Sequence, residues 1–144
     1  MKMEKNTRII LALDVTTKDD ALRVVRAVKD HVDAIKINWP LILGAGPEII
    51  TDLSKVKHVI CDLKVADIPN TNRLIVEQAM ARGASAIICH GFTGKDAVQA
   101  CVDVAADYGG ACFVVAEMSH PGAPLFFHGG AAEKIASLAI ECGA

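Results

Sequence analysis

The chain has 144 residues, a formal net charge of -2 and 52% hydrophobic residues. This is enough apolar sequence for one domain with a packed core, and it excludes an intrinsically disordered chain. Aromatic residues make up only 4%, so aliphatic side chains must fill the interior, which favours an α/β protein over a β-sandwich. The near balance of charge gives no basis for attraction to nucleic acid or an anionic membrane, and we expect a small-molecule ligand.

The N-terminal residues 1–7 lack the apolar stretch of a signal peptide, and no run is long enough to span a membrane. We therefore expect a single cytoplasmic domain over residues 1–144. The five cysteines are an odd number, and Cys61, Cys89 and Cys112 lie in apolar runs without CxxC spacing. We expect reduced core residues rather than zinc or redox ligands.

Short β-branched runs alternate along the chain with longer helical patterns. Strands are predicted at 9–13, 34–37, 59–63, 86–89 and 112–116. Helices are predicted at 18–29 with Thr16 or Thr17 as N-cap, from Pro47 onward, and at 71–82, 94–107 and 131–141, the last three each followed by glycine. Five successive βα units predict a parallel sheet with right-handed crossovers, either doubly wound or part of a (β/α)8 barrel.

Polar side chains stand at the ends of all five predicted strands. Because ligands of parallel α/β proteins bind at the carboxyl ends of strands, this rim is the candidate site. Unpaired charges beside an apolar core are costly, and a polar pocket would explain the set together. The rim residues are Asp14, Lys36, Asp62, Lys64, His90, Glu117 and Ser119.

The densest charge lies at Asp62, Lys64 and Asp67. Asp62 and Lys64 are two apart on a strand and so share a face. A carboxylate within about 4 Å would favour the lysine ammonium by up to roughly 4 kcal/mol before desolvation is subtracted. A lysine held charged is a poor Schiff-base nucleophile but a good proton donor to a carbanion, as formed in decarboxylation. An ion network that only fixes the loop would have the same residues, so spacing alone leaves both readings open.

Residues 62–71 read DLKVADIPNT, and this D-x-K-x-x-D-I-P-x-T form resembles the signature of the orotidine 5′-monophosphate (OMP) decarboxylase family. The segments LALDV, AIKI, CHGF and EMSHPGA resemble other family segments in the family's order. The resemblance covers essentially the whole chain. It implies a (β/α)8 TIM barrel, here only about the first five βα units, that works as a homodimer and makes UMP in pyrimidine biosynthesis, with no metal or organic cofactor.

The resemblance also implies roles for individual residues. Lys64 would protonate C6 of the pyrimidine as carbon dioxide leaves, with Asp62 next to the substrate carboxylate. Asp67, Ile68 and Thr71 would enter the partner subunit's site, so that each active site is composite.

Three further residues match substrate-binding positions of the family. Asp14 and Lys36 would bind the ribose, although two charges at strand ends could equally be a structural pair. Ser119 would read the pyrimidine edge, and the loop 120–130 after it would begin a closing lid. His90 is not placed in the catalytic set, because a lone histidine there is more often satisfied by a neighbour.

Two alternatives remain. Magnesium-dependent sugar-phosphate decarboxylases of the same superfamily share D-x-K-x-x-D, but they would be expected to carry an acidic metal ligand in place of Lys36 and to lack the Ile68-Pro69-x-Thr71 continuation. The other alternative is an inactive fragment or dimerisation module, because the family's phosphate-binding loops follow strands seven and eight and missing strands would leave open sheet edges. We expect little turnover by the 144 residues alone. The segment Asn38-Trp39-Pro40 departs from the family pattern, in which a small residue and a less bulky aromatic residue would be expected after the second strand. We expect this difference to affect the local packing and not the reaction.

Overall fold

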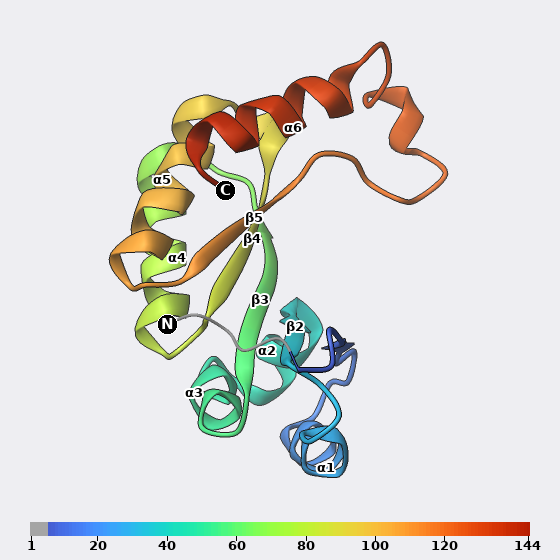
Figure 1. The fold of residues 1–144 in the computed structure, drawn as a ribbon, viewed down its shortest axis with the longest axis vertical. Helices are drawn as coiled ribbons and strands as arrows, with labels where there is room; N and C mark the ends of the chain where they lie inside the picture. Colours follow the sequence, from blue (N-terminus) through green and yellow to red (C-terminus); the bar gives the residue numbers. More distant parts are fainter. Residues whose placement is uncertain (1–5) are drawn as a thin grey trace.

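The computed structural model describes residues 6–144, which contain one five-stranded parallel sheet in the order β1-β2-β3-β4-β5 (Figure 1). Each strand pairs in parallel with the next one along the chain. This order is expected when successive strands are joined by right-handed helical crossovers on one side of the sheet. The strands are β1 (Ile10–Ala12), β2 (Ala34–Asn38), β3 (His58–Val65), β4 (Ala86–His90) and β5 (Ala111–Val115). All five predicted strands are therefore present.

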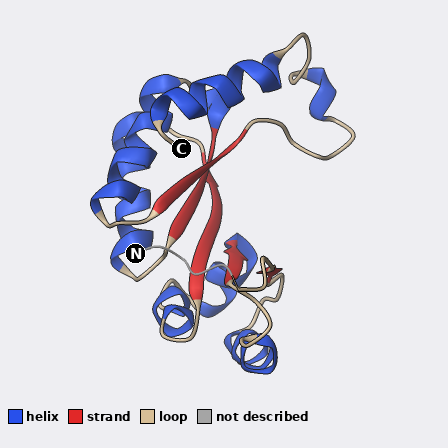
Figure 2. Cartoon of the chain, in the orientation of Figure 1, coloured by secondary structure: helices blue, strands red, loops and turns tan. Residues whose placement is uncertain are grey.

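The helices form an arc around one side of the sheet and leave its other side open (Figure 2). They are α1 (Lys18–Val28), α2 (Trp39–Ala45), α3 (Ile49–Ser54), α4 (Pro69–Ala81), α5 (Lys95–Asp107) and α6 (Ala131–Cys142), with the short 3₁₀ turns η1 (Gly91–Thr93) and η2 (Ala123–Leu125). This arrangement is a partial (β/α)8 barrel. No helix within residues 6–144 combines the length and the apolar character needed to cross a membrane.

The main hydrophobic core lies between the sheet and the helices. Alternate strand residues, such as Ile35 and Ile37 of β2, point into it and are fully buried, as the two-residue period of a strand requires. Burial of each such side chain stabilises the folded state by about 1.5–3 kcal/mol. The cysteines are all free and buried, which confirms the expectation for Cys61, Cys89 and Cys112. Burial raises the pKa of the Cys61 thiol to about 12, as befits a packing residue.

The opposite face of the sheet would be the interior of a closed barrel. A small buried cluster of Ala34, Ile60 and Ala86 covers only its middle. Toward the two edge strands the apolar side chains remain open to solvent: Ile10 of β1 is 49% exposed and Phe113 of β5 is 45% exposed. Within residues 6–144, the outer edges of β1 and β5 pair with no further strand. The inner face is thus apolar and incompletely covered.

One helix was not predicted. The chain after β2 forms α2, with Pro40 in its first turn, where the missing N–H of proline costs no helical hydrogen bond. Pro47, expected in the first turn of the next helix, instead precedes α3, which begins at Ile49. The N-cap of α1 is confirmed as Thr17, whose Oγ1 accepts from the Asp20 amide at 3.2 Å.

The entry of the chain into β1 is tied to the sheet through the buried carboxylate of Asp33. It accepts backbone N–H groups from Asn6, Thr7 and Arg8, at 2.8 Å for the last, and the Thr7 hydroxyl at 3.1 Å. The Thr7 amide, opposed by burial and assisted by the other donors, lowers the pKa of Asp33. The carboxylate therefore stabilises the fold only while it is ionised.

This anchor predicts a pH-dependent difference in stability between the chain and its Asp33→Asn variant. Because the folded-state pKa of Asp33 is depressed, its stabilisation is fully present above the unfolded value of about 3.9 and is lost as pH falls through the folded value. The melting temperature of Asp33→Asn should lie below that of the parent at pH 7, and the gap should shrink toward pH 3. Asp30→Asn, at an exposed position nearby, is the control. A gap that stays constant or widens in acid would contradict the anchor.

Candidate active site

Three charged side chains on the inner face meet at the carboxyl ends of β2 and β3; we call Lys36, Asp62 and Lys64 the ionic array. The Nζ of Lys36 lies 2.9 Å from Oδ2 of Asp62, and the Nζ of Lys64 lies 2.8 Å from Oδ1 of the same carboxylate. β2 and β3 pair in parallel register with Asn38 opposite Asp62, which lets Lys36 reach across. The prediction that Lys64 lies beside an acid of its own strand is confirmed for Asp62.

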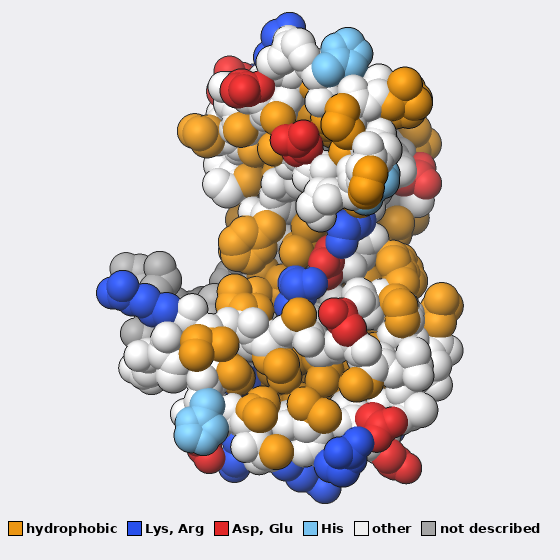
Figure 3. Space-filling model, turned by 90° about the vertical axis from the view of Figure 1, so that its right-hand side faces the viewer, with side chains coloured by type: hydrophobic (Ala, Val, Ile, Leu, Met, Phe, Trp, Pro, Cys, Tyr) orange, Lys and Arg blue, Asp and Glu red, His pale blue; other side chains and the backbone are white. Residues whose placement is uncertain are grey.

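The three side chains of the ionic array differ in their exposure to solvent. The Asp62 side chain is only 8% exposed, whereas those of Lys36 and Lys64 are 28% and 40% exposed. Burial acts to raise the pKa of the Asp62 carboxyl, but the hydrogen bonds and charges of Lys64 and Lys36 outweigh it and leave the pKa below its usual value. One buried carboxylate is thus shared by two ammonium groups, and the lysine heads face the open side of the sheet. Figure 3 shows charged side chains in the middle of this face with hydrophobic ones around them.

Lys64 occupies an unusual backbone conformation. Its φ is +47°, in the left-handed region that non-glycine residues seldom adopt. The pairing of β3 with β4 shifts between Cys61 and Val65, so three β3 residues lie opposite one β4 residue. Such a bulge re-aims a side chain, and strained residues of this kind cluster at functional sites. Lys64 therefore departs from regular strand geometry at the bulge, and its Nζ lies 2.8 Å from Oδ1 of Asp62 there.

Asp14 is predicted to bind ribose or, alternatively, to form a structural pair with Lys36, and within the described residues it does not bond Lys36. Its Oδ1 accepts a hydrogen bond from Nδ2 of Asn38 at 2.7 Å. Because a carboxylate only accepts hydrogen bonds, the NH₂ group of Asn38 must face Asp14. The Oδ1 of Asn38 then faces away and is buried without a hydrogen-bond partner among residues 6–144. The structural-pair alternative with Lys36 is therefore not formed. Asn38, noted from sequence only as a departure from the family pattern, joins Asp14 to the rim of the site.

His90 ends β4 on the same face. Burial lowers its pKa below the ordinary value, with a further contribution from the charge of Lys64, so the ring is neutral at physiological pH. Its Nδ1 is buried with no hydrogen-bond partner in the described chain, and its ring lies 4.7 Å from that of Phe92. The sequence-based expectation that a neighbour satisfies this histidine is therefore wrong for Nδ1. The sequence signals for His90 were its place at the end of a predicted strand and its place in the CHGF segment.

Asp67 and Ile68 do not join the ionic array of their own chain. Asp67 is exposed and makes no ion pair among residues 6–144, while its Oδ1 accepts from the Ile68 amide at 2.7 Å. Ile68 is 66% exposed. Both residues line a cleft of about 600 Å³ with residues 93–97 at the start of α5. The expected contact of a second acid with Lys64 is therefore absent within one described chain.

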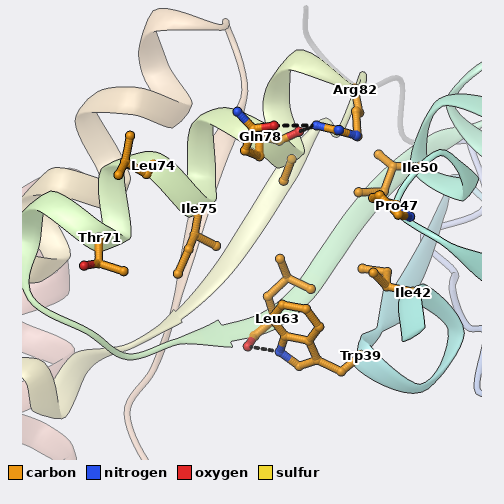
Figure 4. Close-up of a pocket in the computed structure, with 11 residues that line it drawn as sticks. Trp39, Ile42, Pro47, Ile50, Leu63, Thr71, Leu74, Ile75, Gln78 and Arg82 are labelled. Carbon is orange, nitrogen blue, oxygen red and sulfur yellow. Dashed lines mark hydrogen bonds between the residues drawn. The ribbon is translucent and has the colours of Figure 1, made fainter. Parts of the chain in front are cut away.

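Thr71 lines one end of a groove of about 420 Å³ on the helical side of the sheet (Figure 4). The groove lies between α4 and the α2–α3 segment, and its floor includes Leu63. Trp39 lies along one wall, and its indole Nε1 donates to the carbonyl oxygen of Leu63 at 2.8 Å. This bond joins the unpredicted helix α2 to the bulge that carries Lys64. The bulky Trp39 is accommodated, which answers the packing question raised by its segment.

Ser119 is exposed in the loop after β5 and, with Glu117, His120 and Pro124, lines a shallow cleft of about 390 Å³. The loop crosses away from the sheet, and Phe127 near its end lies 6.5 Å from the ring of Phe92. Ser119 forms no hydrogen bond with the ionic array. No group of three or more His, Cys, Asp or Glu side chains in the described part of the chain is arranged to hold a metal ion.

The fold and site together define the class: parallel α/β barrels with a lysine–aspartate–lysine array at the carboxyl ends of neighbouring strands. The profile of the Orotidine 5'-phosphate decarboxylase / HUMPS family matches residues 7–141, and the chain belongs to that family. The Orotidine 5'-phosphate decarboxylases of Methanosarcina mazei and Methanococcoides burtonii are 55% and 54% identical to it over 142 residues. The alignments cover 99% of this chain and 64% and 66% of those relatives, so the chain spans about two thirds of their length.

Solved structures agree with this assignment. The crystal structure of Orotidine 5'-monophosphate decarboxylase from Methanocaldococcus jannaschii superposes with a TM-score of 0.88 at 45% identity, over 94% of this chain and 67% of that one. The same enzyme complexed with inhibitor BMP gives 0.88 at 46% identity, over 94% and 64% of the two chains. At this identity the likeness extends beyond fold to sequence, and it confirms the resemblance noted from residues 62–71.

Proposed function

We propose that the protein carrying this chain decarboxylates OMP to UMP, with Lys64 as the proton donor to C6. The observation that supports this most directly is the ionic array, in which a lysine on a bulged strand is held beside a buried carboxylate with its ammonium toward the open face. Decarboxylation needs a positive group where a carbanion develops and a proton to deliver there. Lys64 supplies both.

The proposed step balances with the chain's own groups. The bond from C6 to the carboxyl carbon breaks, its electron pair stays on C6, and carbon dioxide leaves. The Lys64 ammonium transfers a proton to C6, and the neutral amine then regains a proton from solvent. Asp62 and Lys36 hold Lys64 in place, because the carboxylate bonds both ammonium groups. Asp62 would lie beside the substrate carboxylate. Asp62 would favour loss of that carboxylate either by charge repulsion or by holding Lys64 in position.

The remaining site residues are proposed in binding roles. Asp14 and Lys36 would contact the ribose from the edge of the array, and Ser119 would meet the pyrimidine when its loop closes. Asp67, Ile68 and Thr71 would serve the site of a second subunit, which fits their position away from the ionic array of their own chain. The active unit would then be a homodimer with composite sites.

The magnesium-dependent sugar-phosphate reaction is less well supported. That reaction would need an acidic metal ligand at the position of Lys36. The Nζ of Lys36 instead donates a hydrogen bond to Oδ2 of Asp62 at 2.9 Å. A cation beside two ammonium groups would be repelled. We therefore favour a reaction that needs no metal.

A direct assay would use this chain continued by the part of the Methanosarcina mazei relative that it does not match, here called the closed-barrel chimera. We expect the chimera to convert OMP to UMP at the same rate with and without excess EDTA, measured by loss of OMP absorbance. Arabino-hex-3-ulose 6-phosphate and 3-keto-L-gulonate 6-phosphate are the comparison substrates. Turnover of a sugar phosphate, or activity abolished by EDTA and restored by Mg²⁺, would contradict the proposal.

A further inference from the structure

The loop that carries Asp67 and Ile68 is held by one buried side chain, Asn72. Asn72 lies in the first turn of α4 and is 0% exposed, although its amide is polar. Its Oδ1 accepts from the Asp67 backbone N–H at 2.9 Å, and its Nδ2 donates to the carbonyl oxygen of Ala97 in α5 at 3.2 Å. Both ends of the amide are thus satisfied, as a buried polar group requires.

These two bonds connect three elements: the loop after β3, the start of α4 and the first turn of α5. The loop follows Lys64 directly, so its course is constrained at one end by the bulge and at the other by Asn72. A further bond from the Ile68 amide to Oδ1 of Asp67, at 2.7 Å, closes the turn. The outcome is an exposed but rigidly held segment, with Ile68 66% exposed.

An exposed apolar side chain on a fixed loop is costly to the isolated subunit and useful to a complex. A segment already held in its bound conformation loses little conformational freedom when it docks. We propose that Asn72 is a positioning residue that presets Asp67 and Ile68 for the partner subunit's active site. This inference rests on the composite site of the proposed function. Asn72 bonds Asp67 and Ala97, and within the described residues it forms no hydrogen bond with the ionic array of its own chain.

The position of Asn72 predicts that it acts on the neighbouring site rather than its own. In the closed-barrel chimera, Asn72→Ala should lower kcat/KM roughly 10²-fold, the scale of an ångström-sized misplacement. Asn70→Ala, an exposed asparagine in the same helical turn, is the matched control and should retain the parent value. Full activity of Asn72→Ala would overturn the proposal.

Mixing subunits separates this role from a general loss of structure. In a heterodimer of Asn72→Ala with Lys64→Ala, one site combines the intact Lys64 of the first subunit with the correctly held loop of the second. Random exchange of equal amounts of subunits should restore about a quarter of the parent activity, because half of the dimers carry one good site of two. A mixture of Asp67→Ala with Lys64→Ala tests the composite site itself.

The outcomes are distinguishable. If Asp67→Ala with Lys64→Ala restores no activity, the composite site of the proposed function is wrong. If that mixture recovers but the Asn72→Ala mixture does not, Asn72 acts within its own subunit and this inference is wrong. Should Asn72→Ala not fold, amide hydrogen exchange of the parent decides: we expect the Asp67 amide to be protected, and exchange at the rate of a free loop amide would overturn the anchor.

Discussion

Lys64→Ala in the closed-barrel chimera is expected to lower kcat for OMP decarboxylation by about 10²–10⁴-fold, the usual contribution of a positioned proton donor. The loss should fall on kcat more than on KM, because the ammonium matters most where negative charge develops at C6. The measurement is steady-state turnover at saturating OMP. An unchanged kcat would remove Lys64 from the mechanism.

The structure indicates that this variant will fold. After Lys64 is truncated, Lys36 still donates to Asp62, so no buried carboxylate is left without a partner. Lys29→Ala is the matched control, since Lys29 is an exposed lysine at the C-terminal end of α1. The C-terminal end of a crossover helix lies near the amino ends of the strands, whereas the site lies at their carboxyl ends. Its kcat should equal the parent value, and the melting temperatures of both variants should show whether folding explains any loss.

The second large effect is expected from covering the open face of the sheet. The 144-residue chain alone should show little or no OMP turnover and should self-associate as its concentration rises. Its β1 and β5 edges present unpaired backbone groups, and Ile10 and Phe113 are about half exposed on the inner face. The closed-barrel chimera should form a defined dimer, with turnover, because the added strands pair both edges. Sedimentation velocity over a range of concentrations, together with the OMP assay, measures both properties.

A charged residue on the inner face provides the control for this second prediction. Phe113→Lys should reduce self-association of the 144-residue chain, because an inward-pointing charge on an edge strand opposes edge-to-edge contact. It should also prevent the chimera from closing, since the same position would then enter the barrel interior. Robust OMP turnover by the 144-residue chain as a monomer would contradict both the open-face argument and the assignment of phosphate binding to later strands.

Much of the fold was predictable because it follows from local patterns. Short β-branched apolar runs mark β2, β3 and β4 in the sequence, and Thr17 and the glycines mark helix ends. Helix α2 was missed because WPLILGA is short, apolar and contains proline, so its periodicity is weak. Its stability comes from packing Leu41 into the core and from the bond between Trp39 and Leu63.

The candidate site was predictable only in part. The motif of residues 62–71 identified Asp62, Lys64 and Asp67 as a set, yet within one described chain only the first two meet. Spacing along a chain does not reveal the turn after β3, in which the bond to Asn72 directs Asp67 toward α5. Asn38 carried no distinctive motif, and His90, although part of the CHGF segment, had no assigned role; both enter the site through their places at strand ends.

By itself, the sequence determined the five βα units, the family signature and which residues carry charge at the rim, because hydrophobic period and residue type are local properties. Only the tertiary structure decided the pairing: that Lys36, 26 residues before Asp62, shares its carboxylate with Lys64, and that Asp14 bonds Asn38 instead. Those partners depend on the register between parallel strands and on the bulge at Lys64. Both arise from backbone hydrogen bonding between distant segments, which residue order alone does not specify.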